Sequence, residues 1–302
     1  MVNRKVKRLF VGTAVLIALF IGVEIYLRCY WGFCDTVLMQ SSDKFEYIAQ
    51  PNQNRFRFRK HVNYNEFSMR SKNISPKDKV RIIGFGDSVI NGSTYTTDQD
   101  SIATSIIEEK LKDKGVRCLN VSAGSWGPDN CYAYIKEYGD FDAVAVFLVV
   151  SSHDAYDTMD FSPAVDVRPN FPSKQYKLAT WELTDKLIDG YLIPYLLKRG
   201  PTEDYIIRGD TFNSGFENFY NYTQEKNISF FIYLHPDKNE VENGYYGDDG
   251  KEIIKFCMER NIPLILGMDF EDKSCFRDAI HLNEQGQRVL ANALLTQIKK
   301  LL

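Results

Sequence analysis

VRIIGFGDSVING, residues 80–92, joins two different sequence patterns, and the rest of the chain is organised around this junction. Its first half is a short apolar run rich in β-branched residues, which predicts a buried strand. The run then breaks into Gly86-Asp87-Ser88, and Asn91 and Gly92 add further turn-forming residues. The pattern therefore places a serine directly after a buried strand.

Ser88 is a useful nucleophile only if a base accepts its hydroxyl proton. The four histidines of the chain are His61, His153, His235 and His281. His281 has an obvious orienting partner, because Asp278 lies three residues before it. A turn of this length can bring the carboxylate to Nδ1 of the imidazole and leave Nε2 for the serine. These residues predict a Ser-His-Asp triad.

Strand-like and helix-like segments alternate after Ser88. Strands are expected at 116–121, 142–150, 228–234 and 263–266, and helices at 98–114, 130–138, 251–260 and 283–302. Helices between short buried strands predict a three-layer α/β/α sandwich with a mainly parallel sheet. In such sheets, sites form at the carboxyl ends of strands, where Ser88 and the turns after Val121 and Val150 fall.

The two ends of this region resemble the SGNH/GDSL hydrolases. Gly86-Asp87-Ser88-Val89 and Asp278-x-x-His281 are similar to the first and last signature blocks of that family, in the same order and at a similar separation. The resemblance covers Val80 to Leu302. It implies a flavodoxin-like fold and ester chemistry in which Ser88 attacks, His281 is the base and Asp278 orients it, with no metal or organic cofactor.

The resemblance also implies an oxyanion hole, to which the N–H of Ser88 contributes. In the second family block, a glycine five residues after an asparagine supplies a backbone N–H. Here Ser125 stands at that position and Gly124 precedes it. A backbone N–H needs no particular side chain, so the donor is expected from Gly124 or Ser125.

The third block departs further from the family pattern. The chain has Ser151-Ser152-His153-Asp154 where the family has Gly-x-Asn-Asp. The imidazole N–H of His153 is expected to replace the asparagine amide as the third donor. Alternatively, His153 is only a loop residue, and the oxyanion hole lacks one donor, as in a slow enzyme or one that has lost hydrolysis.

The N-terminus predicts a membrane segment. Four basic residues within positions 1–8 precede an apolar run over 9–27 that only Glu24 interrupts, and about 20 residues are needed to cross a bilayer. The basic flank predicts a single-pass membrane protein with a cytoplasmic tail and an extracytoplasmic domain, periplasmic or at the cell surface. A cleaved signal peptide and a cytosolic protein are the alternatives, although no small-x-small cleavage motif follows the run.

Residues 28–79 are expected to form a juxtamembrane linker with an edge hairpin, before a catalytic domain over 80–302. Within the linker, residues 55–59 alternate Arg and Phe, as in a strand that lays its phenylalanines on the domain and turns its arginines to water. The basic cluster at 55–60 is interpreted as a solvated face, with binding of anionic lipid or an acidic glycan as the alternative. His61 is expected at the surface.

A cap over the substrate pocket is expected at 159–219, a long and poorly patterned segment. It includes a helix over 181–198 that is interrupted near Pro194. Trp126, Tyr156 and His235-Pro236 are candidates to line the pocket, although ordinary packing is the favoured interpretation for each.

Charge and cysteine content narrow the class of protein. The net charge of the 302 residues is −3, so nothing points to nucleic acid. Six cysteines fit an exported protein that can form disulfides, and Cys29 with Cys34 and Cys257 with Cys275 are possible pairs. None has the spacing of a zinc site, and Cys118 and Cys257 lie in apolar contexts typical of core residues.

The sequence predicts a serine esterase or O-acyltransferase that removes or transfers a small acyl group, such as acetyl, on a cell-envelope glycan. The glycan is implied by the resemblance to membrane-anchored members of the family, because a fold does not identify a substrate. The alternatives are a lipid esterase or lysophospholipase with the same triad, and a glycan-binding module that has lost catalysis.

Overall fold

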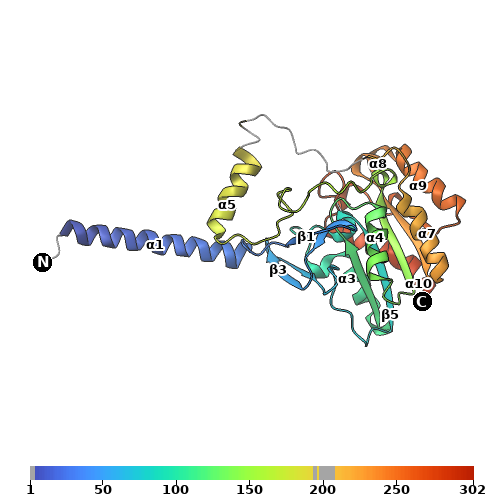
Figure 1. Ribbon diagram of the computed structural model, residues 1–302, viewed down its shortest axis with the longest axis horizontal. Helices are drawn as coiled ribbons and strands as arrows, with labels where there is room; N and C mark the ends of the chain where they lie inside the picture. Colours follow the sequence, from blue (N-terminus) through green and yellow to red (C-terminus); the bar gives the residue numbers. More distant parts are fainter. Residues whose placement is uncertain (1–3, 193–195, 197–207) are drawn as a thin grey trace. The chain divides into compact units, whose positions relative to one another are not determined.

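The computed structural model describes residues 4–192, 196 and 208–302 (Figure 1). The chain divides into two compact units. The first comprises Met1–Thr36, Arg55–Arg59 and Lys174–Glu203, and the second comprises Val37–Asn54, Lys60–Ser173 and Asp204–Leu302. Both units therefore contain segments that are far apart in the sequence.

A five-stranded parallel sheet forms the centre of the second unit, as the alternating pattern predicts. Its strands are β5 (Val80–Gly86), β6 (Val116–Ser122), β7 (Ala145–Ser151), β8 (Ser229–His235) and β9 (Leu264–Leu266). They lie in the order β6-β5-β7-β8-β9, and every neighbouring pair is parallel. The strands are short apolar runs, and β7 is buried along its whole length because helices cover both faces of the sheet.

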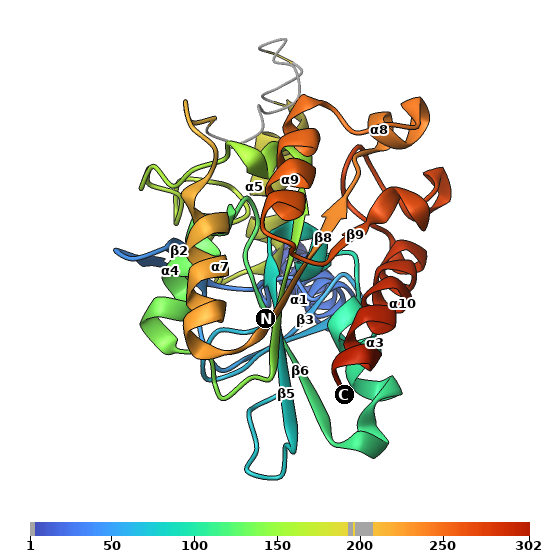
Figure 2. The same cartoon turned by 90° about the vertical axis from the view of Figure 1, so that its right-hand side faces the viewer.

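Helices cover the sheet on both faces, which gives the predicted three layers (Figure 2). One face packs against α4 (Pro128–Tyr138), α7 (Ser214–Lys226) and α9 (Asp248–Glu259). The other packs against α2 (Ser88–Asn91), α3 (Ala103–Lys110) and α10 (Glu284–Leu301). Alternation along the strands divides the core, since Ile83 of β5 faces the first layer and Ile82 faces the second.

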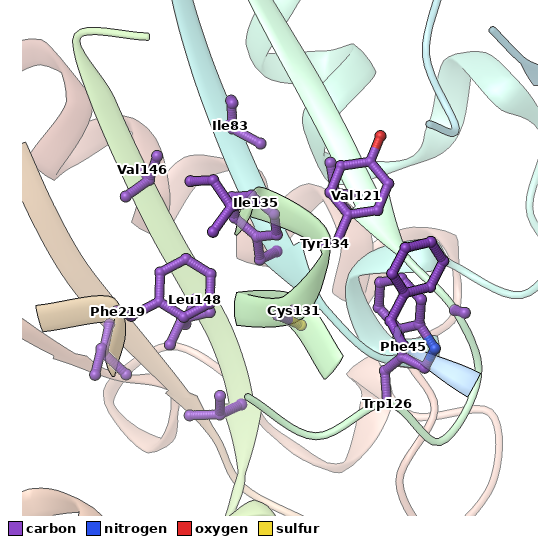
Figure 3. Packing of buried hydrophobic residues seen from close by; sticks show 14 of the residues in the cluster. Phe45, Ile83, Val121, Trp126, Cys131, Tyr134, Ile135, Val146, Leu148 and Phe219 are labelled. Atoms are coloured by element: carbon purple, nitrogen blue, oxygen red, sulfur yellow. The ribbon is translucent and has the colours of Figure 1, made fainter. Parts of the chain in front are cut away.

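The first of these layers is rich in aromatic side chains (Figure 3). Cys131, Tyr134 and Ile135 of α4 pack onto the strands. Trp126 is fully buried beside Phe45, with ring centroids 5.6 Å apart, and its Nε1 donates to the carbonyl of Tyr47 at 2.9 Å. Trp126 is therefore a core residue, in agreement with the favoured interpretation of ordinary packing.

Two small antiparallel hairpins precede the sheet. β1 (Met39–Ser42) pairs with β2 (Glu46–Ala49), a hairpin that the sequence did not predict. β3 (Gln53–Arg57) pairs with β4 (Lys60–Tyr64), in agreement with the expected edge hairpin. His61 is exposed, as expected.

The first unit contains α1 (Arg4–Trp31), α5 (Ala179–Leu187) and a π-helical turn, η4 (Ile188–Leu192). Arg57 lies in its interior with only 1% of its surface exposed. Its Nη2 is 2.6 Å from Oε1 of Glu182, and its guanidinium lies over the rings of Phe33 and Phe58. The expectation that all three arginines face water is thus wrong at Arg57, because its partner is distant in sequence.

Other differences from the expected elements are local. The helix expected at 98–114 is divided into η1 (Gln99–Ser101), α3 and η2 (Lys112–Lys114). α7 overlaps the end of the segment interpreted as a cap and packs against the sheet instead. The helix expected at 181–198 begins at Ala179, and Pro194 and Lys198 lie outside the described residues. Further short elements are η3 (Ser152–Ala155), α8 (Lys238–Asn243), η5 (Gly267–Asp269) and η6 (Lys273–Cys275).

All six cysteines belong to the described part of the chain, and all six are free. The possible pairs Cys29 with Cys34 and Cys257 with Cys275 are therefore not formed. Cys118 and Cys257 are buried, as expected of small core residues, and Cys131 and Cys275 are buried as well.

Gly86 ends β5 in a conformation that other residues rarely adopt, with φ +157°. A Cβ atom there would lie 2.4 Å from the carbonyl oxygen of Val149 in β7. We expect Gly86→Ala to lower the free energy of unfolding by about 2 kcal/mol, because an added methyl group must push two paired strands apart.

Urea unfolding of Gly86→Ala and Gly247→Ala measures this effect. Gly247 has φ −61°, and an added Cβ would meet its nearest atom at 3.5 Å, so this control is expected to cost less than about 1 kcal/mol. Equal stability of the two variants would contradict the close approach at Gly86.

Candidate active site

Ser88 lies where the order of the strands reverses. β5 has β6 on one side and β7 on the other, so the chain leaves the end of β5 in one direction and returns on the opposite side. Crevices form at such points beyond the carboxyl ends of parallel strands. Ser88 begins α2, and Oδ1 of Asp87 caps the helix by accepting from the N–H of Val89 at 2.8 Å.

The structure brings Ser88, His281 and Asp278 together. Nε2 of His281 is 2.9 Å from Oγ of Ser88, across 193 positions of sequence. Nδ1 of the same ring is 3.0 Å from both oxygens of Asp278. The order carboxylate, imidazole and hydroxyl is the geometry of a catalytic triad.

Asp278 is held in its ionised form. Burial raises the pKa of its carboxyl, but the backbone N–H groups of His281 and Ile280 and the nearby imidazole and Arg277 together lower that pKa to about 2. Nη2 of Arg277 lies 2.9 Å from Oδ2. An ionised carboxylate at Nδ1 keeps the proton on that nitrogen, so Nε2 presents its lone pair to the serine.

A buried ion pair lies behind the loop that carries His281. Nε2 of His235 is 2.7 Å from the carbonyl oxygen of Ile280, and Nδ1 is 2.8 Å from Oε2 of Glu271. The hydroxyl of Tyr233 donates to the other oxygen of Glu271 at 2.5 Å. Both members of the pair are fully buried. The pair therefore ties the end of β8 to the residue that precedes His281.

The surroundings of His235 favour the imidazolium form, because both ring nitrogens face oxygen atoms. Burial lowers the pKa of His235, but the charge of Glu271 and the carbonyl of Ile280 outweigh it and raise the pKa above its ordinary value. His235 is therefore an interior residue, as the favoured interpretation of ordinary packing predicts, and not one that lines the pocket. Glu271 and Tyr233 carried no signal in the sequence.

Buried amides join α2 to the end of β6. Nδ2 of Asn91 donates to Oγ of Ser122 at 3.0 Å and to the hydroxyl of Tyr64 at 3.1 Å. Nδ2 of Asn120 donates to the carbonyl of Ile90 at 2.9 Å. These bonds fix the short helix that begins with Ser88.

A buried arginine holds the loop that follows α2. Arg70 donates to the carbonyl of Asn91 and, through Nη2, to the carbonyl of Thr97 at 2.7 Å. Its complete burial lowers the pKa of the guanidinium to about 10. Sequence reasoning missed Arg70, because nothing in its local sequence marks it as buried.

A pocket of about 380 Å³ opens beside the triad. Ser88, His281 and Arg277 line it together with two further groups of residues. Apolar side chains come from Met39, Ala49 and Phe171, and hydroxyl-bearing side chains come from Ser93, Thr94, Tyr95 and Thr96. Among the described residues, Tyr156 and Pro236 do not line this pocket.

Only some of the residues expected to supply oxyanion donors line the pocket that contains Ser88. Ser88 is the first residue of α2, so its N–H has no acceptor within the helix. Gly124 lines the pocket, whereas Ser125 is not among the described residues that do. His153 lines a different pocket, together with Asp237 and others, and not the one that contains Ser88.

Among the residues that the structure describes, one group has the geometry to hold a metal ion. Ligand atoms of His153, Asp154 and Asp157 lie within 4.8 Å of one another. Burial and the charge of Asp87 raise the pKa of Asp154 well above its usual range, which favours a neutral carboxyl.

No family model and no curated protein matches the chain. Its structure is similar to that of a lipolytic protein of the G-D-S-L family from Desulfitobacterium hafniense DCB-2, with 10% identity, a TM-score of 0.43, and coverage of 74% of this chain and 100% of the other. It is also similar to the acetyl xylan esterase AlAXEase, with 15% identity, a TM-score of 0.45, and coverage of 72% and 100%. The psychrotrophic esterase EstA from Pseudoalteromonas sp. is also similar, with 13% identity, a TM-score of 0.42, and coverage of 73% of this chain and 97% of the other.

The ion pair of His235 and Glu271 predicts a particular dependence of stability on pH. Because folding raises the pKa of His235, the stabilisation is complete below the unfolded value of about 6.5 and is lost as pH rises through the folded pKa. We expect Glu271→Gln to lower the free energy of unfolding by about 3 kcal/mol at pH 6, and by less at pH 9.

Denaturant unfolding of the wild type and of Glu271→Gln at several pH values measures this difference. Glu252→Gln is the matched control, because Glu252 forms an exposed pair with Lys255 at 3.5 Å, and such pairs contribute little. A difference between wild type and Glu271→Gln that is constant or grows with pH would contradict a charged His235.

Proposed function

We propose that the chain is a serine esterase or O-acyltransferase of the SGNH/GDSL type. The observation that supports this most is the 2.9 Å contact between Oγ of Ser88 and Nε2 of His281, with Asp278 on the other ring nitrogen. The two blocks of sequence that resemble the family supply these three side chains. A binding module that had lost catalysis would have no need to keep this geometry.

In the proposed reaction, Oγ of Ser88 forms a bond to the carbonyl carbon of an ester while Nε2 of His281 accepts the hydroxyl proton. The tetrahedral intermediate then collapses, the bond to the alcohol breaks, and the imidazolium gives its proton to the leaving oxygen. Water or a second alcohol next attacks the acyl-serine, with His281 again as base, and the proton finally returns to Ser88. Asp278 stabilises the imidazolium of His281 in both halves of the reaction, the formation and the breakdown of the acyl-serine.

Two backbone donors and one amide are proposed for the oxyanion. The N–H groups of Ser88 and Gly124 border the pocket. Asn170 and Asn91 also line it, but the amide of Asn91 is committed to Ser122 and Tyr64. No described residue hydrogen-bonds the amide of Asn170. We therefore assign the third donor to Asn170, in place of His153.

The pocket favours a small acyl group on a polar alcohol. A volume of about 380 Å³ lies near the lower end of the range for small-molecule sites. Its apolar side suits a short acyl group, and the hydroxyl groups of Ser93, Thr94 and Thr96 suit a sugar. An acetylated cell-envelope glycan fits both requirements. A lipid esterase is the second candidate, because Met39 and Phe171 give the pocket an apolar wall.

A retained membrane anchor is proposed for α1. The helix is 28 residues long and apolar enough to span a bilayer, and its first two turns carry the four basic residues of the N-terminal flank. The last part of α1 belongs to the folded first unit, because Leu27 packs with Phe33 and Ala179. Cleavage of a signal peptide would remove part of that core. The catalytic unit would then lie on the extracytoplasmic side.

Substitution of the triad tests the proposed function. We expect Ser88→Ala and His281→Ala to lower kcat for a chromogenic acetyl ester by at least about 10⁴-fold, because each removes a participant in proton transfer or bond formation. Circular dichroism checks that both variants are folded. Full activity of Ser88→Ala would rule out the proposed mechanism, and long-chain esters hydrolysed faster than acetyl esters would favour the lipid esterase.

A separate experiment tests whether Asn170 or His153 supplies the third hydrogen-bond donor to the oxyanion. We expect Asn170→Ala to lower kcat on the order of 100-fold with little change in KM, because an oxyanion donor acts mainly in the transition state. We expect His153→Ala to keep kcat within about twofold of the wild type, because His153 lines another pocket. The reverse result would assign the donor to His153.

A further inference from the structure

α5 of the first unit is packed on one side and exposes apolar residues on the other. Ala179 and Leu183 pack in a small core with Leu27 and Phe33 of the same unit. On the opposite side, Trp181, Ile188 and Leu192 are 65%, 40% and 49% exposed. Their spacing of seven and four residues places them on one stripe of a helical segment. We therefore expect this apolar stripe to contact something outside the first unit.

Glu24 fixes where α5 begins. The residue before α5, Leu178, offers no side-chain cap. Instead, Oε1 of Glu24 in α1 accepts from the N–H of Ala179 at 2.6 Å, and Oε2 accepts from the N–H of Thr180 at 3.0 Å. A carboxylate at a helix N-terminus satisfies orphan donors and interacts favourably with the helix dipole. Glu24, the one acidic residue of the apolar run, thus has a structural partner.

This attachment point lies at the end of the apolar part of α1. The side chains of the most apolar window of α1 are exposed in the structure. Tyr26, Tyr30 and Trp31 follow Glu24 closely and are exposed. Aromatic residues at the end of an apolar span mark the boundary between hydrocarbon and water. α5 therefore starts at the level of the membrane interface, if α1 spans the bilayer as proposed.

We propose that α5 and η4 form a second membrane-contacting element, an amphipathic helix that lies in the bilayer interface beside α1. Figure 1 shows α5 running across the direction of α1, as a helix in the membrane plane does when its neighbour crosses the membrane. The stripe of Trp181, Ile188 and Leu192 is then immersed in lipid next to the lipid-facing surface of α1. Asp185 lies on the same stripe, between Trp181 and Ile188, and its carboxylate accepts a hydrogen bond from the hydroxyl of Tyr176.

The inference rests on the proposed membrane span, and the three tryptophans of the chain allow the two to be tested apart. Trp126 is buried in the other unit, Trp31 lies at the end of α1, and Trp181 lies on α5. The full chain is reconstituted in phosphatidylcholine vesicles brominated near the headgroup end of the acyl chains. Tryptophan emission is compared for Trp31→Phe, Trp181→Phe and the double variant, each against unbrominated vesicles.

Bromine is expected to quench part of the emission of Trp31→Phe, and this quenching is expected to be lost in the double variant, whose remaining tryptophan is buried. Quenching of Trp181→Phe but not of Trp31→Phe would overturn the lipid contact of α5 while keeping the span of α1, and would leave the stripe to a protein partner. No quenching in either single variant, with protein that fails to float with the vesicles, would overturn the span and the inference together.

Discussion

The contact between His281 and Ser88 depends on a buried charge pair that touches neither residue. His281 sits on a short irregular loop, and such loops are held only by the bonds made to their backbone. One bond comes from His235, whose second ring nitrogen faces Glu271. Asp278 then organises the loop from the other side through the N–H groups of Ile280 and His281. The imidazole is therefore positioned by two carboxylates, that of Asp278, which is partly exposed, and that of Glu271 in the interior.

Ser88 is positioned by different means, which depend on the sheet. The end of β5 is confined between β6 and β7, and the close approach at Gly86 lets the strand turn directly into α2. Amides and a guanidinium from outside the strand then fix the helix and the following loop. Ser88 and His281 are thus supported largely by different hydrogen bonds, which are joined by the bond between the two residues and by Arg277, which contacts both Asp278 and Thr96.

The sequence was sufficient for the parallel sheet and for the contact between Asp278 and His281 because both are marked locally. Short apolar runs mark the strands, and the spacing of Asp278 and His281 produced the contact that it predicted. The sequence did not predict the surroundings of residues whose main interaction partner is far away along the chain. Arg57 looked like a solvent-facing residue of an alternating strand, but Glu182 removes it from water. His153 looked like a donor by its place in a motif, yet the loop turns it into another pocket. α7 was missed because its four buried positions lie in a segment rich in polar and aromatic residues.

The capping of α5 by Glu24 also has a consequence for biosynthesis. The two partners are 155 positions apart, so the carboxylate leaves the ribosome long before the helix that it caps. In the interval, β5, β6 and β7 are all synthesised, because they lie between the two segments in the chain. The first unit can therefore be completed only after these strands have been synthesised, although its first helix leaves the ribosome before any of them.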